Sequence, residues 1–224
     1  MSDSGFRRLH ISLAFLVTAT VVAVGVSFAE DEKPKGDAYP LDTCIVTGQK
    51  LGAMGEPVIY DQQGRELRFC CKACVKTFES KTSEYLEKID QALIKRQLPD
   101  YPLDTCPVTG QKLGGSMGEP VNYIYKNRLV RFCCKGCVAQ FEKEPAKYLK
   151  TLDEAVIAKQ KADYPLDTCV VTGQKLGTMG DAIDYVHANR LVRFCCKGCI
   201  DTFRKDPTKY MAVIDEALKA KEKK

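Results

Sequence analysis

Twelve cysteines account for most of the chemistry that this sequence of 224 residues could perform. They fall into three sets of four, and each set combines one upstream cysteine with a later Phe-Cys-Cys-Lys-x-Cys segment. The sets are Cys44, Cys70, Cys71 and Cys74; Cys106, Cys133, Cys134 and Cys137; and Cys169, Cys195, Cys196 and Cys199. Four thiolates suit tetrahedral Zn²⁺, and soft thiolates equally suit Cu(I). The sequence therefore predicts three cysteine sites, each for one Zn²⁺ or Cu(I)-class ion.

The spacing inside a set allows its sulfurs to converge. Cys71 and Cys74 lie at the expected start of a helix, and Cys70 lies one helical turn from Cys74. These three side chains can face one point, which Cys44 would close from a turn on the opposite side. The helix N-terminus and the neighbouring Lys72 favour the thiolate form that binds metal.

Disulfide bonds are the alternative to metal ions. An even number of cysteines in a small exported module normally indicates disulfides. A bridge between the adjacent Cys70 and Cys71 would be strained, so the pairing would need, for example, Cys71 with Cys74 and Cys44 with Cys70. Four converging sulfurs favour metal, while disulfides and free buried thiols stay open as alternatives.

Composition excludes several other kinds of site. The chain has no Trp and only two histidines, His10 and His187, so no histidine site can recur in all three sets. We expect His187 at the surface, in a hairpin turn. Lys and Glu are interspersed and the net charge is only +5, which indicates a solvated surface and no nucleic-acid partner. A Cys-x-x-Cys oxidoreductase needs a larger βαβ fold than one small unit supplies, so we expect no enzymatic activity.

The N-terminal segment has the pattern of an export signal. Arg7-Arg8 precede an apolar run over residues 11–28, and Ser27-Phe28-Ala29 places small residues where a signal peptidase reads. We expect a signal peptide over residues 1–29, a polar linker over 30–38 and a periplasmic or otherwise extracytoplasmic protein. An uncleaved membrane anchor is the alternative, since the run approaches the ~20 residues that span a bilayer.

Beyond the linker, one unit occurs three times in tandem. Tyr-Pro-Leu-Asp-Thr-Cys opens each copy, which places the repeats at residues 39–98, 101–160 and 164–222. A complete cysteine set in each long copy predicts separate small beads and argues against a solenoid. At this size a hydrophobic core alone supplies little stability, so the cysteines are expected to staple each bead.

Each bead is predicted to be a β-hairpin followed by two helices, an α+β fold. Residues 121–125 and 129–132 read as two strands that turn at Lys126-Asn127. The first helix should start near the Cys-x-x-Cys segment. The second should begin where an acidic residue precedes a proline, at Glu144-Pro145 and Asp206-Pro207.

The second unit carries a pattern that resembles a known family. It contains Cys106-Pro107-Val108-Thr109-Gly110, then Arg131-Phe132-Cys133-Cys134-Lys135-Gly136-Cys137, then Phe141 and Pro145-x-x-Tyr148. These residues resemble the TRASH/YHS group of small treble-clef-like domains, which is linked to heavy-metal sensing, trafficking and resistance. The resemblance extends over all three units and so over nearly the whole mature chain.

The resemblance implies a ligand set for each unit. The lone cysteine and the Cys-x-x-x-Cys pair of the family match Cys44, Cys70 and Cys74, and the equivalent triads of the other units. The remaining cysteines, Cys71, Cys134 and Cys196, would each be a fourth ligand or a spare. The chain departs from the family because Ile45 and Val170 replace the motif proline. Its loop between the first two cysteines is also long, which bears on the geometry of the site.

Together these features predict an exported metal-binding protein that buffers, carries or detoxifies Zn²⁺ or Cu(I)-class ions. The alternative is a scaffold of repeats, stapled by structural zinc or disulfides, that binds another protein at the cell envelope. Contact with a membrane is expected only through an uncleaved N-terminal segment. Three methionines at matching points of Gly-rich loops are expected to be apolar plugs over the cores, with Cu(I) ligation as the alternative. They are Met54, Met117 and Met179.

Overall fold

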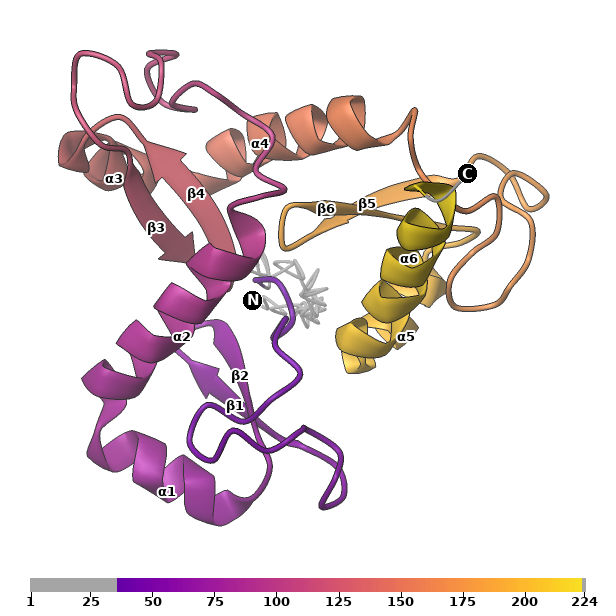
Figure 1. Ribbon diagram of the computed structural model, residues 1–224, viewed down its shortest axis with the longest axis horizontal. Helices are drawn as coiled ribbons and strands as arrows, with labels where there is room; N and C mark the ends of the chain where they lie inside the picture. The colour runs from indigo at the N-terminus through magenta and orange to yellow at the C-terminus, as the bar shows by residue number, and fades with distance from the viewer. Residues whose placement is uncertain (1–35, 223–224) are drawn as a thin grey trace, which may run out of the picture. The chain divides into compact units, whose positions relative to one another are not determined.

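The computed structural model describes residues 36–222 of the chain (Figure 1). The strands are β1 (Val58–Gln62), β2 (Arg65–Phe69), β3 (Val121–Tyr125), β4 (Arg128–Phe132), β5 (Ile183–His187) and β6 (Arg190–Phe194). The helices are α1 (Lys72–Ser80), α2 (Thr82–Gln97), α3 (Lys135–Phe141), α4 (Pro145–Gln160), α5 (Gly198–Lys205) and α6 (Pro207–Glu222). Two strands and two helices follow one another in repeat 1 (β1 to α2), repeat 2 (β3 to α4) and repeat 3 (β5 to α6). The predicted α+β fold of three small units is therefore confirmed.

The expected signal peptide, residues 1–29, lies outside the described residues. Between residues 36 and 222, no helix combines the length and the apolar character that crossing a membrane requires.

Each hairpin closes through a two-residue turn with positive φ at both positions. In repeat 2 these residues are Lys126 (φ 46°) and Asn127 (φ 74°), as predicted. Val121 pairs with Phe132 in this hairpin, and the three hairpins share the same antiparallel register. Turns with two positive φ values match the right-handed twist of paired strands. In repeat 1 the turn is Gln63-Gly64, and the two preceding residues, Asp61 and Gln62, pair within the hairpin.

The helix starts agree with the sequence. α1 begins directly after Cys71, and α4 and α6 begin at Pro145 and Pro207. The acidic caps differ between copies, because the Glu144 side chain makes no capping hydrogen bond while Asp206 Oδ1 accepts one from Lys209 N at 3.2 Å. Proline at the first helical position therefore marks both starts, and the acidic side chain caps only α6.

Each repeat has its own aromatic core beneath the hairpin. In repeat 2 the rings of Phe132 and Phe141 lie 5.4 Å apart, and both side chains are fully buried. The equivalent rings lie 5.3 Å apart in repeat 1 and 5.5 Å apart in repeat 3. Each such pair contributes about 0.5–1.5 kcal/mol beyond its buried area. Cys133 and Cys137 belong to the same buried cluster, so this core fixes the position of the cysteines.

The second helix of one repeat packs on the hairpin of the next, α2 on β3 and β4, and α4 on β5 and β6. Gln97, at the end of α2, donates from Nε2 to Asn127 O (2.8 Å) and accepts at Oε1 from Leu129 N (2.9 Å). Gln160, at the end of α4, makes the same pair of bonds to Asn189 O (3.0 Å) and Leu191 N (2.8 Å). One interface is thus built twice.

Arginine and asparagine side chains reinforce both interfaces. Arg65 donates from Nε to Asn127 Oδ1 at 2.8 Å, and Arg128 donates in the same way to Asn189 Oδ1 at 2.9 Å. Asn127 also donates to the carbonyls of Asp37 (3.0 Å) and Glu66 (2.6 Å). The hairpin turns therefore connect two strands within a repeat and also form the contacts that hold neighbouring repeats together.

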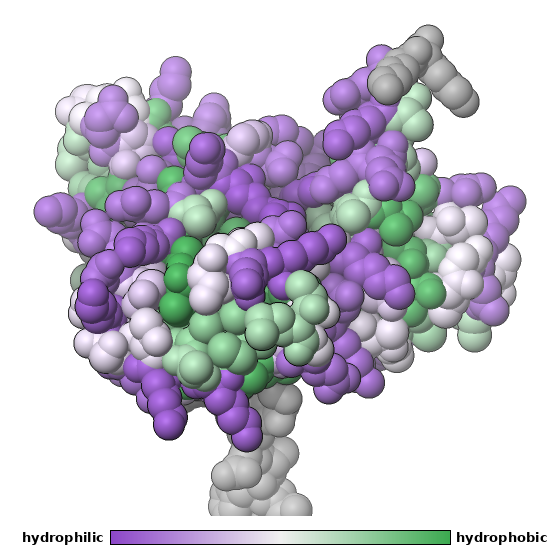
Figure 2. All heavy atoms as spheres, turned by 60° about the horizontal axis from the view of Figure 1, so that its bottom comes forward, coloured by the Kyte–Doolittle hydropathy of each residue, from purple (hydrophilic) through white to green (hydrophobic). Residues whose placement is uncertain are grey.

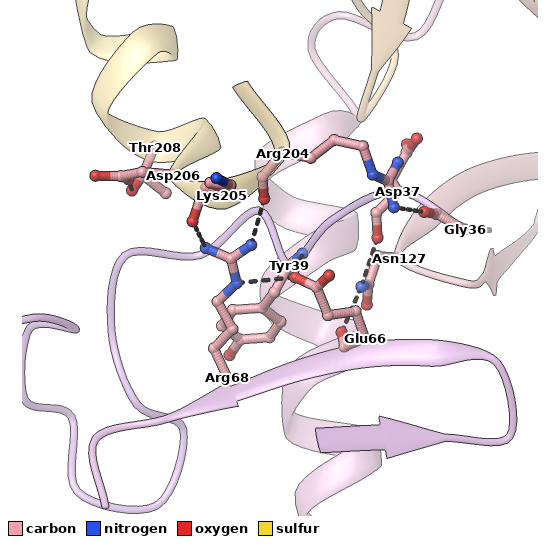
Figure 3. Close-up of polar contacts among 10 residues, drawn as sticks. All are labelled: Gly36, Asp37, Tyr39, Glu66, Arg68, Asn127, Arg204, Lys205, Asp206 and Thr208. Carbon is pink, nitrogen blue, oxygen red and sulfur yellow. Dashed lines mark hydrogen bonds and ion pairs between the residues drawn. The ribbon is translucent and has the colours of Figure 1, made fainter. Parts of the chain in front are cut away.

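Repeat 3 also contacts repeat 1 (Figure 3). Arg68 donates to the carbonyls of Arg204 and Lys205, at 2.7 Å each, at the end of α5. Arg204 reaches back to Gly36 O at 2.9 Å, and Asp37 Oδ2 accepts from Ala188 N at 2.8 Å. The last residues of the expected linker therefore pack among the repeats, with Gly36 and Asp37 half-buried and Ala38 fully buried.

Candidate metal centre

Three cysteine sulfurs meet in every repeat. Cys44, Cys70 and Cys74 are buried, and their sulfurs all lie within 4.8 Å of one another. Equivalent clusters form in the other two repeats; they are Cys106, Cys133 and Cys137, and Cys169, Cys195 and Cys199. Nine of the twelve predicted ligands therefore converge as groups of three.

The separations fit sulfurs that share one metal ion. The Sγ atoms of Cys70 and Cys74 lie 3.5 Å apart, and the equivalent pairs in repeats 2 and 3 lie 3.7 Å apart. Zn–S bonds of ~2.3 Å set sulfurs about 3.8 Å apart in a tetrahedron and about 4.0 Å apart in a trigonal site. All twelve cysteines are free, and the separations exceed the ~2.05 Å of a disulfide bond. The donors therefore fit a soft metal ion in either geometry.

The fourth cysteine of each set lies beside the cluster of three. Cys71 Sγ is 3.6 Å from Cys74 Sγ, and the same distance recurs for Cys134 and Cys196 in their repeats. These residues are only partly buried. Cys71 does not belong to the group in which all sulfurs lie within 4.8 Å. Its role as a fourth ligand remains a prediction.

A turn, a strand end and a helix start position the three sulfurs. Cys44 lies on a turn in which its N–H donates to Gln49 O and its carbonyl accepts from Gly48 N. Gly48 has φ 71°, a left-handed conformation that glycine adopts without steric cost. Cys70 follows β2 directly, and Cys74 lies in the first turn of α1. The cluster thus joins segments that are far apart in the sequence.

Backbone hydrogen bonds prepare one thiol in each cluster to ionise. Burial raises the pKa of Cys44, but hydrogen bonds from the N–H groups of Cys70, Thr47 and Val46 and from the Thr47 side chain outweigh burial and lower the pKa to about 7. Cys106 and Cys169 have the same surroundings, and their pKa values are also lowered to about 7. Burial instead raises the pKa of Cys74, and the adjacent sulfurs raise it further. A cation in the cluster would favour the thiolate at every position, because it pairs with all three charges.

Sequence reasoning missed a threonine in each site. Thr47 Oγ1 lies 3.5 Å from Cys70 Sγ, and the equivalent distances for Thr109 and Thr172 are 3.4 Å. Each hydroxyl can donate a hydrogen bond to the sulfur and so stabilise its thiolate. The available signal was the recurrence of Val-Thr-Gly, which places a threonine three residues after the first cysteine of each unit.

Two expectations about single residues are wrong. Met54, Met117 and Met179 are 65%, 53% and 62% exposed, so they do not plug the cores. The leucine that precedes each Gly-rich loop, Leu51 in repeat 1, packs against the core instead. His187 is only 1% exposed, because the turn consists of Ala188-Asn189 and leaves His187 inside β5.

Comparisons of the chain with protein family models, with curated proteins and with solved structures gave no match. The functional argument therefore rests on the geometry of the cysteine clusters.

Proposed function

We propose that this protein binds three soft metal ions, one Zn²⁺ or Cu(I)-class ion in each repeat, and carries or buffers them outside the cytoplasm. The observation that carries the proposal is the buried three-sulfur cluster that recurs with the same spacing in every repeat. Thiolate sulfur is the ligand that such ions prefer over magnesium or calcium. The resemblance to the TRASH/YHS family and the export pattern of residues 1–29 support the same proposal.

A partly buried thiol beside each cluster supports cargo over purely structural metal. Cys71 lies within 3.6 Å of a buried ligand and is itself accessible in part. An incoming ligand can replace such a sulfur while the other three hold the ion, so the ion can leave stepwise. A closed structural zinc site, by contrast, offers no open ligand position. The exposed Met54, Met117 and Met179 place further soft thioethers at the surface of each repeat.

The surface gives less support to the alternative of a protein-binding scaffold. Among residues 36–222, the exposed large hydrophobic side chains are the three loop methionines with Ile59, Leu98 and Val213, and none is aromatic. The face in Figure 2 shows hydrophilic residues around smaller hydrophobic groups. Protein-binding surfaces are typically enriched in Tyr, Trp and Phe.

Native mass spectrometry with a free-thiol count tests metal binding directly. Protein purified without oxygen should carry three metal ions and twelve free thiols. Serine at Cys74, Cys137 and Cys199 together should remove the metal, whereas serine at the exposed Thr77 position should leave three ions bound. Six disulfides without metal would refute the proposal.

Chelator competition separates cargo from structural metal. A carrier should release its ions to a competing chelator while the circular dichroism of the helices persists. Complete loss of helix on chelation would identify the metal as structural. N-terminal sequencing of the mature protein tests export, and a first residue at Glu30 is expected.

A further inference from the structure

A cavity of about 220 Å³ lies between the end of α2 in repeat 1 and the start of α6 in repeat 3. Arg96, His187, Arg190 and Met211 are among the residues that line it. A single water molecule needs only about 10–15 Å³, so this cavity has room for a small polyatomic ligand. None of the twelve cysteines lines it, and it is distinct from the metal clusters.

His187 brings an unpartnered polar group to this cavity. The side chain is 1% exposed, and neither ring nitrogen has a hydrogen-bond partner among the described residues. One face of its environment is apolar, because the imidazole packs edge-on against Phe203 at 5.2 Å between centroids. Buried polar atoms in folded proteins nearly always have a partner. The cavity is where a partner for this imidazole can lie.

Most other polar groups in the cavity wall are already engaged. Arg190 forms ion pairs with Asp215 at 2.5 Å and with Asp100 at 3.7 Å, so both carboxylates are neutralised by this arginine. The Gln97 side chain is held by the interface with repeat 2. Arg96, in contrast, has no acidic partner within residues 36–222. The uncommitted groups are therefore a guanidinium and an imidazole, and both can donate hydrogen bonds.

The charges around His187 are mainly positive. Burial lowers the pKa of His187 most, and Arg204 of α5, Arg96 of α2 and Arg128 of β4 add to this effect while Glu66 of β2 opposes it. The pKa that results is about 3. The imidazole is thus neutral without a ligand. An anion beside it would offset the three arginines and allow the ring to take up a proton.

We propose that this cavity binds one small oxyanion, of the class of inorganic phosphate, sulfate or a small carboxylate, between the guanidinium of Arg96 and the imidazole N–H of His187. Arginine recognises such oxyanions through paired charge-assisted hydrogen bonds. The ligand joins repeat 1 to repeat 3 and thereby reinforces the contact that Arg68 makes with α5. The other two repeats lack this site, because the positions that match His187 are Gln62 and Tyr125.

NMR of the imidazole tests this site with inorganic phosphate as the probe. Phosphate titrated into the full chain should shift the ring nitrogen signals of His187 and raise its pKa from about 3 toward the ordinary 6.5. Sulfate and acetate arms define which oxyanions fit. Unchanged His187 signals at saturating concentrations of all three anions would overturn the proposal, as would binding of Zn²⁺ or Cu(I) to the ring.

Matched variants show whether the named residues hold the anion. Arg96 is exposed, so Arg96→Gln should fold normally and weaken phosphate binding about tenfold or more, the effect of one charge-assisted contact. Lys159→Gln alters the equivalent position of α4 and should leave phosphate affinity unchanged. Equal affinities for the Arg96 variant and the unaltered protein would assign the binding to another place on the surface and end this proposal.

Discussion

At the scale of single residues, the thiols of one cluster differ in how readily they ionise. The sulfur of Cys44 accepts hydrogen bonds from three backbone N–H groups, and its pKa is about 7. Burial and the adjacent sulfurs instead raise the pKa of Cys74. The first negative charge of a metal-free cluster therefore lies on the cysteine of the turn. This charge gives an arriving cation its first electrostatic partner before the helix cysteines lose their protons.

This difference predicts how stability depends on pH in the reduced, metal-free protein. Between pH 7 and 9 the unfolded thiols, with an ordinary pKa of 9.0, bind more protons than folded Cys44, Cys106 and Cys169. The free energy of unfolding should therefore rise with pH over this range. Above pH 9 it should fall, because Cys74 and its equivalents keep their protons longer when folded.

Urea denaturation at a series of pH values, with reductant and chelator present, measures this dependence. Alanine at Cys44, Cys106 and Cys169 together should reduce the rise between pH 7 and 9. The remainder comes from Cys71, Cys134 and Cys196, whose pKa values are also lowered by hydrogen bonds to Cys74 and its equivalents. An unaltered protein with a flat profile over this range would contradict the prediction.

The fourth cysteine predicts an asymmetry between two sets of variants. Serine at Cys71, Cys134 and Cys196 should leave three ions bound but make each easier to remove, because the buried trio persists. Serine at the equivalents of Cys74 should abolish binding, because each of those sulfurs contacts two others. Competition with a chromogenic chelator gives both affinities. An equal loss of metal affinity in the two sets of variants would contradict this asymmetry and mean that all four sulfurs contribute equally to binding.

At the scale of elements, the β-hairpin turn has two structural tasks. Asn127 adopts a positive φ that the two-residue turn requires, and its side chain bonds to repeat 1 through Arg65 and two carbonyls. Asn189 does the same between repeats 2 and 3, with Arg128 and Leu129 as partners. Asparagine suits both tasks because it tolerates the left-handed conformation and carries a donor and an acceptor.

Asn127→Ala should therefore destabilise the protein by about 2–4 kcal/mol, since it strains the turn and leaves buried polar groups unpaired. Asn122→Ala is the matched control on the same hairpin. Asn122 is exposed and accepts one bond, from Arg131 at 3.0 Å, so its loss should change stability by less than about 0.5 kcal/mol. Chemical denaturation measures both, and similar values for the two variants would contradict the role of the turn as a joint.

At the scale of the whole molecule, repeats 1 and 3 each have one surface that lacks the residues found at the interfaces between repeats. Gln97 and Gln160 close the two interfaces, but repeat 3 has the exposed Glu222 at the matching position. Lys219 likewise replaces the apolar Ile94 and Ile157. The hairpins of repeats 2 and 3 contact the preceding helix through apolar and asparagine side chains. The matching positions in repeat 1 carry charged or small residues, which are Asp61, Gly64 and Glu66. The interface formed by Gln97 and Gln160 is therefore not repeated at these two surfaces.

The shared interfaces predict that the three repeats unfold together. The described repeats form one compact unit, so the full chain should show a single denaturation transition. Gln97→Glu introduces, at the interface between repeats 1 and 2, the glutamate that repeat 3 has at the matching position 222. It should lower stability by about 1–3 kcal/mol or split the transition, because a buried carboxylate would face the Asn127 carbonyl. Gln140→Glu adds the same charge at an exposed position of α3 and should have little effect. Three separate transitions in the unaltered protein would show that the repeats are independent.

The sequence by itself determined the repeated unit, its hairpin and helices, and the membership of each cysteine set. Local signals suffice for these features: strand-forming segments around a turn, prolines at helix starts, and the repeated spacing of the cysteines. They also located the candidate metal centre, because thiols at this spacing on a turn and a helix start can converge on one side of a small unit.

The family resemblance implied the trio of Cys44, Cys70 and Cys74, and the structure brings these sulfurs together. Only the tertiary structure decided where the exposed methionines lie and how the repeats join. His187 shows why: its burial depends on whether the hairpin turn includes it and on the helix of another repeat, and neither is visible in the local sequence. Gln97 and Asn127 read as ordinary polar surface residues until α2 packs on the next hairpin. Contacts between segments distant in sequence set these outcomes, since burial and hydrogen-bond partners are properties of the assembled chain.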